Sequence, residues 1–215
     1  MEEIALKPVE KALPDAVHDL LDEAEKRAEA FYEAGLGPRF YRYVPSDPLV
    51  VYRAMEFLQE EGVLRGNRFC ELGCGFGIAA GLASLLGFRA TGIEWEADLA
   101  DRASSLMEHQ GLAVEILEQS YLPEGYESCE GMGGKDLVVP GVGRGGGADT
   151  PMYDGLDPAE VDLFFVYPWP DEEEFMRRLF REIGSEGAVL LMYQGEGESS
   201  AYLWDEEDGL GTGLT

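Results

Sequence analysis

The chain has 215 residues, of which 45% are hydrophobic and 11% aromatic, and it carries a net charge of −27. This length and composition fit a single globular domain that can bury a core without disulfides, and no apolar run approaches the roughly 20 residues of a bilayer-spanning helix. The negative field argues against nucleic acid or membrane surfaces as partners.

The acidic surplus is interpreted mainly as a solvated surface, although it would also attract an amine or a basic protein segment. The first residues show no positive region followed by an apolar block, so we expect no signal peptide and a cytoplasmic location. Three cysteines do not make a disulfide framework, and the two histidines lie far from them in the sequence, so we expect no metal site.

Two helices are predicted ahead of the first glycine-rich motif. Apolar residues recur at helical spacing over 15–35 and again over 48–61, where Ser46 or Asp47 can cap the second helix. Between these helices the chain is expected to be extended, because Pro45 and Pro48 are incompatible with a helix. We therefore interpret residues 1–62 as an N-terminal helical extension.

From residue 63 onward, predicted strands alternate with predicted helices. The strands are expected at 68–73, 89–95, 112–120, 161–169 and 188–195, and the helices at 78–87, 96–110 and 171–184. This alternation predicts an α/β fold with a doubly wound, mostly parallel, Rossmann-like sheet over 63–200. A glycine-rich insertion at 123–160, with one short strand near 135–140, is interpreted as a lid, with disorder as the alternative, and 201–215 as an acidic tail.

The stretch "FCELGCGFG" (69–77) combines a strand-like start, one carboxylate and three alternating glycines. Ligands of open α/β sheets bind at the carboxyl ends of the strands, which is where this stretch falls. Gly73, Gly75 and Gly77 allow the backbone to turn tightly and to approach a ligand closely. A plain turn from strand to helix needs fewer glycines, so we predict a ligand site here.

Two kinds of cofactor fit such a loop: a dinucleotide, with its pyrophosphate at the helix N-terminus, or S-adenosylmethionine. Glu71, just before the loop, would repel a pyrophosphate but suits the ammonium of a methionine moiety. The loop contains no basic residue. Glu94, at the end of the second predicted strand, could bind ribose hydroxyls in either cofactor. The residues therefore favour S-adenosylmethionine.

A resemblance to a known family rests on these same stretches. "FCELGCGFG" resembles motif I of class I S-adenosylmethionine-dependent methyltransferases, and "GIEWE" resembles their acidic second-strand motif. The resemblance covers about residues 40–122 and 160–195. "YRYVPSDPLVVYRAM" is also similar to a cofactor-covering segment found in a subgroup that includes the non-SET protein lysine methyltransferases and their bacterial relatives.

The resemblance implies roles for individual residues. Glu71 would hold the methionine ammonium, Glu94 the ribose, and Trp95 would pack beside the adenine. The other implied cofactor-lining residues are Tyr43, Ser46, Gly73, Cys74, Gly75, Gly77, Ser120 and Tyr121. Ser120 stands where the family often has an aspartate, so the contact to the adenine amino group would fall to Glu118 or Tyr121.

The sequence "YPWP" makes Tyr167 and Trp169 the candidate catalytic residues. It corresponds in position to the Asn-Pro-Pro-Tyr type motif of amino-group methyltransferases, with tyrosine in place of the leading amide. An aromatic wall beside the methyl donor could hold a planar or cationic acceptor. A strand end turned by two prolines, with both rings in the core, is an equally good interpretation. Tyr167 is the candidate general base.

Three functions remain open at this point. The first is a methyltransferase for an amine or a basic protein side chain, the second a methyltransferase for a small metabolite. The third is a Rossmann protein that binds S-adenosylmethionine or a dinucleotide without methyl transfer. It is kept because little chain follows residue 195, so either the sheet is shortened at its C-terminal edge or 199–209 supplies an edge strand. Nothing indicates an oligomeric state.

Overall fold

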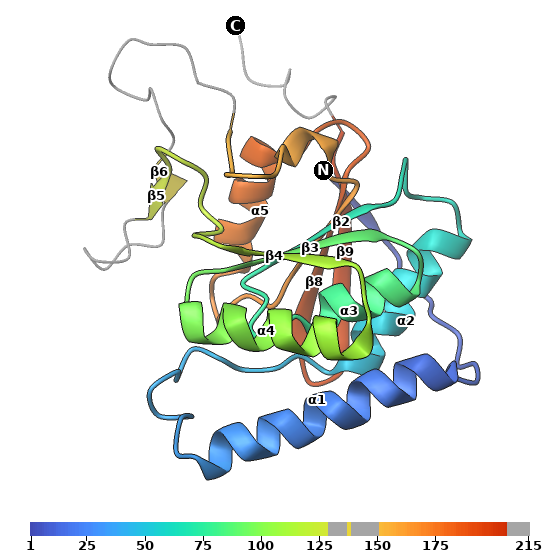
Figure 1. Ribbon diagram of the computed structural model, residues 1–215. Helices are drawn as coiled ribbons and strands as arrows, with labels where there is room; N and C mark the ends of the chain where they lie inside the picture. The colour runs from blue at the N-terminus through green and yellow to red at the C-terminus, as the bar shows by residue number, and fades with distance from the viewer. Residues whose placement is uncertain (129–136, 139–150, 206–215) are drawn as a thin grey trace, which may run out of the picture.

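The computed structural model describes residues 1–128, 137–138 and 151–205. Its centre is a seven-stranded sheet in the order β1-β9-β8-β7-β2-β3-β4 (Figure 1). The parallel strands are β2 (Arg68–Leu72), β3 (Arg89–Glu94), β4 (Val114–Glu118), β7 (Leu163–Val166) and β8 (Val189–Gly195). The predicted α/β fold with a mostly parallel sheet is confirmed.

Helices cover both faces of the sheet (Figure 1). One face packs against α3 (Ile78–Leu85) with α2 (Pro48–Glu60) and α4 (Ala97–Gln110), and α1 (Asp15–Glu33) lies outside α3 and α4. The other face packs against α5 (Glu173–Ile183). The central strand β7 serves both cores, because Leu163 and Phe165 face one while Phe164 and Val166 face the other.

The two N-terminal helices form where the residue pattern predicts. The expectation of an extended chain between them is wrong for residues 37–42, which form turns, with the Tyr43 N–H donating to the Phe40 carbonyl at 2.8 Å. Asp47 rather than Ser46 caps α2: its carboxylate accepts hydrogen bonds from the backbone N–H groups of Leu49 and Val50 at 2.9 and 3.2 Å. Pro48 occupies the first helical position, where its missing N–H costs nothing. No helix of the described residues has the length and apolar character to cross a bilayer.

The strand expected near 199–209 is β9 (Glu198–Leu203), which pairs antiparallel with β8. It is not the edge of the sheet. The chain start supplies that edge as β1 (Glu2–Ile4), antiparallel to β9. β1 satisfies the backbone groups of β9 that would otherwise face solvent, and its own two glutamates blunt the new edge. β9 runs to Leu203, so its last three residues lie in the stretch 201–215 that the sequence analysis interpreted as an acidic tail.

The described ends of the insertion are anchored beside the carboxyl end of β4. Residues 127–128 and 137–138 pair as β5 (Glu127–Ser128) and β6 (Leu137–Val138), the latter within the strand predicted near 135–140. After a short 3-10 turn, η2 (Pro158–Glu160), the chain enters β7. The Tyr153 hydroxyl donates to the carbonyl of Tyr121 at 2.6 Å. The predicted lid falls mostly on 129–136 and 139–150, outside the described residues.

An ionic network ties the sheet together at the amino ends of β2 and β7. Asp162 is buried and accepts from Arg65 Nε at 2.9 Å and from the Arg68 backbone N–H at 2.8 Å. Arg65 also donates to the carbonyls of Ala159 and Val161, both at 2.9 Å. Each of these groups belongs to the end of a strand or to the residues just before it, so the network is structural. It lies at the amino ends of the strands, on the side of the sheet opposite the carboxyl ends.

Candidate functional site

The glycine loop joins β2 to α3 with three left-handed residues. Gly73, Gly75 and Gly77 have φ angles of +74°, +53° and +71°. Side chains disfavour this region, so the backbone path itself requires glycine. The N–H groups of Gly73 and Cys74 both donate to the carbonyl of Ile93 at 2.9 Å. The loop is thereby fixed against β3, at the carboxyl edge of the sheet.

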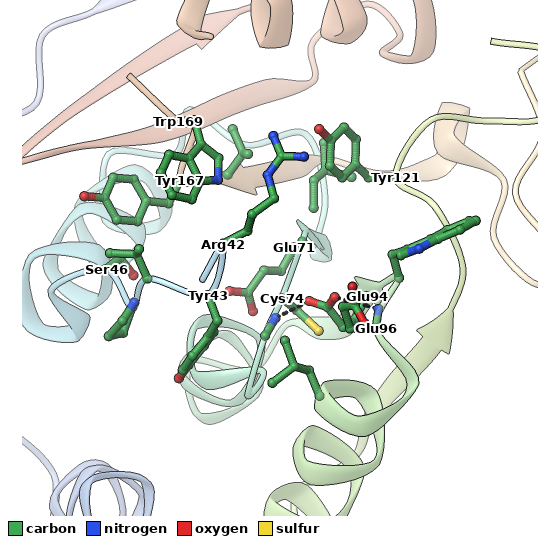
Figure 2. Close-up of a pocket in the computed structure, with 18 of the residues that line it drawn as sticks. Arg42, Tyr43, Ser46, Glu71, Cys74, Glu94, Glu96, Tyr121, Tyr167 and Trp169 are labelled. Atoms are coloured by element: carbon green, nitrogen blue, oxygen red, sulfur yellow. Dashed lines mark hydrogen bonds between the residues drawn. The ribbon is translucent and has the colours of Figure 1, made fainter. Parts of the chain in front are cut away.

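A cavity of about 540 Å³ opens beside this loop, as the fold predicts (Figure 2). Its walls are the loop, the ends of β3, β4 and β7, and residues 39–46, which we call the covering segment. The predicted site residues that line it are Tyr43, Ser46, Glu71, Gly73, Cys74, Gly75, Glu94, Trp95, Ser120, Tyr121, Tyr167 and Trp169. The fold therefore brings residues that are far apart in the sequence together around one cavity.

Gly77 is not among the residues that line the cavity, so its contact with a cofactor stays a prediction. A Cβ atom built there would lie 3.3 Å from Cβ of Ala103 and 3.4 Å from Cδ1 of Ile116. Its φ angle and this close approach to α4 and β4 explain the glycine. Gly73, in contrast, has only Cδ1 of Tyr121 near its Cβ position, at 4.0 Å, so its backbone faces open space.

Glu71 is a buried carboxyl group at the carboxyl end of β2. Its Oε2 accepts from the backbone N–H of Ala80 in the first turn of α3, at 2.8 Å. Burial raises the pKa of Glu71 to about 8, and the nearby Glu94 charge adds to the effect, although the Ala80 bond opposes it. A ligand cation beside Glu71 would favour its ionised form, so the group is suited to an ammonium.

Glu94 closes β3 and is held by backbone donors. Its Oε2 accepts from the N–H of Gly75 at 2.7 Å, and its Oε1 from the N–H of Glu96 at 2.9 Å (Figure 2). Each oxygen has a second lone pair beyond these bonds. The carboxylate is thus both the brace of the glycine loop and a preformed acceptor for ligand hydroxyl groups.

The covering segment is packed onto the glycine loop by aromatic contacts. The ring of Tyr43 stacks on Phe76, with centroids 4.8 Å apart and an interplanar angle of 18°, and meets Phe31 edge-on at 5.8 Å. Burial raises the pKa of the Tyr43 phenol, which therefore stays neutral. At the start of the segment Arg39 forms an ion pair of 2.9 Å with Asp98 of α4.

Arg42 is a cavity residue that the sequence analysis missed. Its Cζ lies 5.8 Å from the ring centroid of Trp169, and its Nη2 lies 3.6 Å from Oε1 of Glu172, just before α5. Figure 2 shows its side chain directed toward the Trp169 and Tyr121 side of the cavity and away from Glu71. The only hint in the sequence is an arginine within the segment similar to a cofactor-covering segment.

Tyr167 is badly placed for the predicted role of general base. Its ring meets Tyr193 edge-on at 4.8 Å, and a Cβ on Gly195 would lie 3.5 Å from its hydroxyl. The hydroxyl therefore points to the turn between β8 and β9, away from Glu71 (Figure 2). Tyr167 contributes a wall to the cavity. Trp169 remains available, because it is only partly buried.

The other predicted residues take structural or rim positions. Ser120 Oγ accepts from the N–H of Leu122 at 3.1 Å, which shapes the turn after β4. Trp95 is 70% exposed at the cavity rim. Cys74 is buried with its sulfur against the backbone of Gly92, and burial raises the pKa of its thiol, so it is an unreactive lining group. No metal-binding cluster of His, Cys, Asp and Glu occurs within the described ranges.

No protein-family model and no curated protein matches the chain. Solved structures similar to it include an RNA methyltransferase from Salinibacter ruber in complex with S-adenosylhomocysteine, at 20% identity and a TM-score of 0.49, with 75% of this chain and 92% of that chain covered. An S-adenosylmethionine-dependent methyltransferase from Clostridium acetobutylicum matches at 13% identity and a TM-score of 0.44, with 77% and 56% covered.

A third such structure, a methyltransferase from Thiobacillus denitrificans in complex with S-adenosylhomocysteine, matches at 18% identity and a TM-score of 0.42, with 69% of this chain and 49% of that chain covered. The chain thus spans only about half the length of the second and third structures. All three identities are below 25% and all three TM-scores below 0.5. The function therefore has to be argued from this chain's own residues.

Proposed function

We propose that the chain is an S-adenosylmethionine-dependent methyltransferase. The observation that carries the proposal is the pair of carboxyl groups, Glu71 and Glu94, on either side of the open backbone at Gly73. A pyrophosphate there would meet two acidic side chains and no cation of the loop, which argues against a dinucleotide. The cavity volume of about 540 Å³ lies within the range for a cofactor-sized ligand.

Each part of the cofactor has a matching group. Glu71 would hold the ammonium, and the free lone pairs of Glu94 would accept the ribose hydroxyls. Trp95 at the rim and Tyr121 beside Gly73 supply aromatic surface for the adenine. When bound, the cofactor supplies an electrophilic methyl group. The chain then orients the acceptor and excludes water, the latter through Tyr43 and the covering segment.

The acceptor is proposed to be an amine nitrogen. Glu96 and Glu172 line the same cavity and would attract the protonated amine, while the apolar walls, Phe165 and Met176 among them, favour loss of its proton before attack. Such an amine needs no dedicated base, which is consistent with the orientation of Tyr167. The packing of the covering segment on the loop supports similarity to the non-SET lysine methyltransferase subgroup, in which a protein side chain would be the acceptor.

A small-metabolite methyltransferase is the second candidate. The observation in its favour is the covering segment itself, which ion pairs hold at its start and in its middle, Arg39 to Asp98 and Arg42 to Glu172. A covering segment that is fixed in this way favours a small molecule that is enclosed in the cavity. It is less suited to a polypeptide substrate that lies across the surface. The two candidates share the cofactor and differ in what enters next to Trp169.

The proposal is tested by calorimetric titration of S-adenosylhomocysteine into wild type, Gly73→Ala and Gly111→Ala. Both glycines have a positive φ, +74° and +64°, so both substitutions strain the backbone similarly. Only Gly73 lines the cavity, since Gly111 caps α4 with nothing within 4 Å of its Cβ position. We expect binding by wild type and Gly111→Ala and at least tenfold weaker binding by Gly73→Ala. Equal affinities in all three would contradict the site.

A further inference from the structure

The turn that follows β7 brings an indole and a carboxylate to the same wall of the cavity. Trp169 and Glu172 both belong to the cavity lining. The N–H of Glu172 donates to the carbonyl of Trp169 at 2.9 Å, and Asp171 between them has a left-handed φ of +68°. A residue with a side chain is unfavourable in this conformation, so the surrounding turn has to hold it there. The backbone that carries both side chains is thus fixed.

A cation already lies at this pair, namely the guanidinium of Arg42 (Figure 2). Its Cζ is 5.8 Å from the ring centroid of Trp169, and its Nη2 is 3.6 Å from Oε1 of Glu172. Arg42 makes at least one further interaction besides these two. An aromatic face and a carboxylate both attract a positive charge. The chain's own arginine therefore marks Trp169 and Glu172 as a place that accepts a cation, and we call these two residues the cation site.

The carboxylate of the cation site is largely removed from water. The side chain of Glu172 is 13% exposed, against 54% for Glu174 in the first turn of α5. A carboxylate taken out of water needs a positive partner, so a ligand that displaces Arg42 has to bring a cation in its place. The present separation of 3.6 Å exceeds the roughly 2.7–2.9 Å of a charge-assisted hydrogen bond. A compact ammonium can approach the carboxylate more closely than that.

A nitrogen held at the cation site cannot itself receive the methyl group. The attacking nitrogen has to be neutral, because its lone pair forms the bond to the methyl carbon while the bond from that carbon to sulfur breaks. The positive charge passes from sulfur to nitrogen, and a proton of the nitrogen then leaves to solvent. A carboxylate beside an ammonium favours the charged form and raises the pKa of the amine. The reacting nitrogen therefore has to lie elsewhere in the cavity.

The apolar part of the lining suits a neutral nitrogen. Phe165 and Met176 are each only 2% exposed and line the same cavity. Removal from water lowers the pKa of an amine, so this region favours loss of the proton. One cavity thus offers one place for a charged nitrogen and another for a neutral one. The net charge of −27 also attracts a molecule with two positive charges more strongly than a molecule with one.

We propose that Trp169 and Glu172 bind the charged end of a small linear acceptor with two basic nitrogens, a diamine or polyamine, and that this end takes the place of Arg42. The inference rests on the proposed function and names the substrate class, with the methyl group going to the other nitrogen. The opposing interpretation is that Arg42 only fastens the covering segment to the turn before α5. The two roles predict opposite effects of removing Arg42.

The probes are putrescine, its analogue with a terminal hydroxyl in place of one amino group, and butylamine, together with a peptide that contains two adjacent lysines. Each is titrated into the full chain with and without saturating S-adenosylhomocysteine, and affinity is followed by ligand-observed NMR. Physiological salt screens attraction to exposed charges. Putrescine should bind at least tenfold more tightly than the hydroxyl analogue and butylamine. Equal binding of these three, or tighter binding of the peptide, would overturn the proposal.

A matched pair of glutamate variants separates the cation site from general attraction to an acidic protein. Glu172→Gln should weaken putrescine binding at least fivefold, because the ammonium loses its carboxylate. Glu174→Gln removes the same charge from an exposed glutamate that is paired with Arg177 at 2.9 Å and does not line the cavity, so putrescine affinity should change less than twofold. Equal effects of the two variants would overturn the proposal.

A matched pair of arginine variants separates displacement from fastening. Arg42→Met should strengthen putrescine binding severalfold, because the ligand no longer competes with the guanidinium. Arg39→Met removes the same charge from the same segment, but from a pair with Asp98 at 2.9 Å, and should change putrescine affinity less than twofold. Unchanged or weaker putrescine binding by Arg42→Met would mean a fastening role and would overturn the proposal.

The two titration conditions keep the inference separate from the proposed function. A preference for putrescine in a wild type that does not bind S-adenosylhomocysteine would contradict the proposed function and support the cation site. Binding of S-adenosylhomocysteine without any preference for putrescine over butylamine would support the function and overturn the cation site.

Discussion

The ring of Tyr43 lies directly over the backbone of Gly75: a Cβ atom on Gly75 would be 2.5 Å from Cε2 and 2.7 Å from Cδ2 of that ring. These two residues join the covering segment to the glycine loop, because the same ring stacks on Phe76. Gly75 thus lines the cavity with its backbone, while its Cβ position points toward the ring of Tyr43. It is glycine because the loop needs a positive φ and because Tyr43 has to come this close.

This contact predicts the effect of Gly75→Val. The valine would displace Tyr43 and with it the covering segment, so S-adenosylhomocysteine binding measured by calorimetry should fall at least tenfold while the far-ultraviolet circular dichroism stays unchanged. Gly62→Val is the control, since Gly62 has a φ of +66° and nothing within 4 Å of its Cβ position. If Gly75→Val kept full affinity, the covering segment would have no part in ligand binding.

The raised pKa of Glu71 predicts a pH dependence of ligand binding. At pH 6 the carboxyl is mostly protonated, because burial raises its pKa to about 8, and an ammonium ligand has to displace that proton. The affinity for S-adenosylhomocysteine should therefore rise between pH 6 and 7.5, with proton release visible in buffers of different ionisation enthalpy. Glu71→Gln should bind more weakly with a flat profile over that range.

Stability gives a check on the same group that needs no ligand. A carboxyl whose folded pKa is raised from 4.5 to about 8 holds its proton more tightly in the folded state than in the unfolded state. The free energy of unfolding of the wild type should fall relative to Glu71→Gln as pH rises through that window. A constant difference between the two proteins in urea titrations at several pH values would show that Glu71 is not desolvated.

The network around Asp162 predicts a stability effect without a binding effect. Asp162→Ala leaves Arg65 without its carboxylate and the Arg68 N–H without its acceptor, and should cost about 2–3 kcal/mol in urea unfolding. Glu160→Ala breaks the exposed pair with Arg68, with exposures of 53% and 43%, and should cost less than about 1 kcal/mol. Similar costs for both variants would contradict the structural role of Asp162.

The local sequence was enough to predict the site residues that directly follow the end of a strand. The glycine loop, Glu71 and Glu94 fall next to the carboxyl ends of β2 and β3, so the alternation of strands and helices was enough to bring them together. The close approach of Gly77 to α4 and β4 was not predicted, because the side it faces depends on how α3 packs against α4. The Arg42–Trp169–Glu172 group joins segments that lie more than 120 residues apart in the sequence. No periodicity or motif contains that information.

The sheet edge was missed for a related reason. The three residues of β1 show no strand pattern of their own, and they become a strand only because β9 offers an unpaired edge. Tyr167 illustrates the same limit for a side chain. Its position after β7 was predicted, but the direction of its hydroxyl is set by Tyr193 and by the turn at Gly195, which come later in the chain.

The charge of the chain predicts a negative result with nucleic acids. With a net charge of −27 and with Arg39, Arg42 and Arg68 each paired to a carboxylate, phosphate backbones would approach against a repulsive field. Mobility-shift assays with tRNA, ribosomal RNA fragments and duplex DNA should show no association at physiological salt. Saturable RNA binding that weakens as salt rises would contradict this and would direct attention to base stacking on Trp169.

The central claim, that the cavity beside Gly73 is built for S-adenosylmethionine, is tested most directly by calorimetric competition between S-adenosylhomocysteine and NAD on the wild-type chain. The carboxyl groups of Glu71 and Glu94 face the loop and suit an ammonium and ribose hydroxyls, whereas a pyrophosphate finds no cation in the loop. S-adenosylhomocysteine should bind at one site per chain, and NAD at tenfold excess should not reduce that binding. Displacement of S-adenosylhomocysteine by NAD, or NAD binding of equal strength, would contradict the claim.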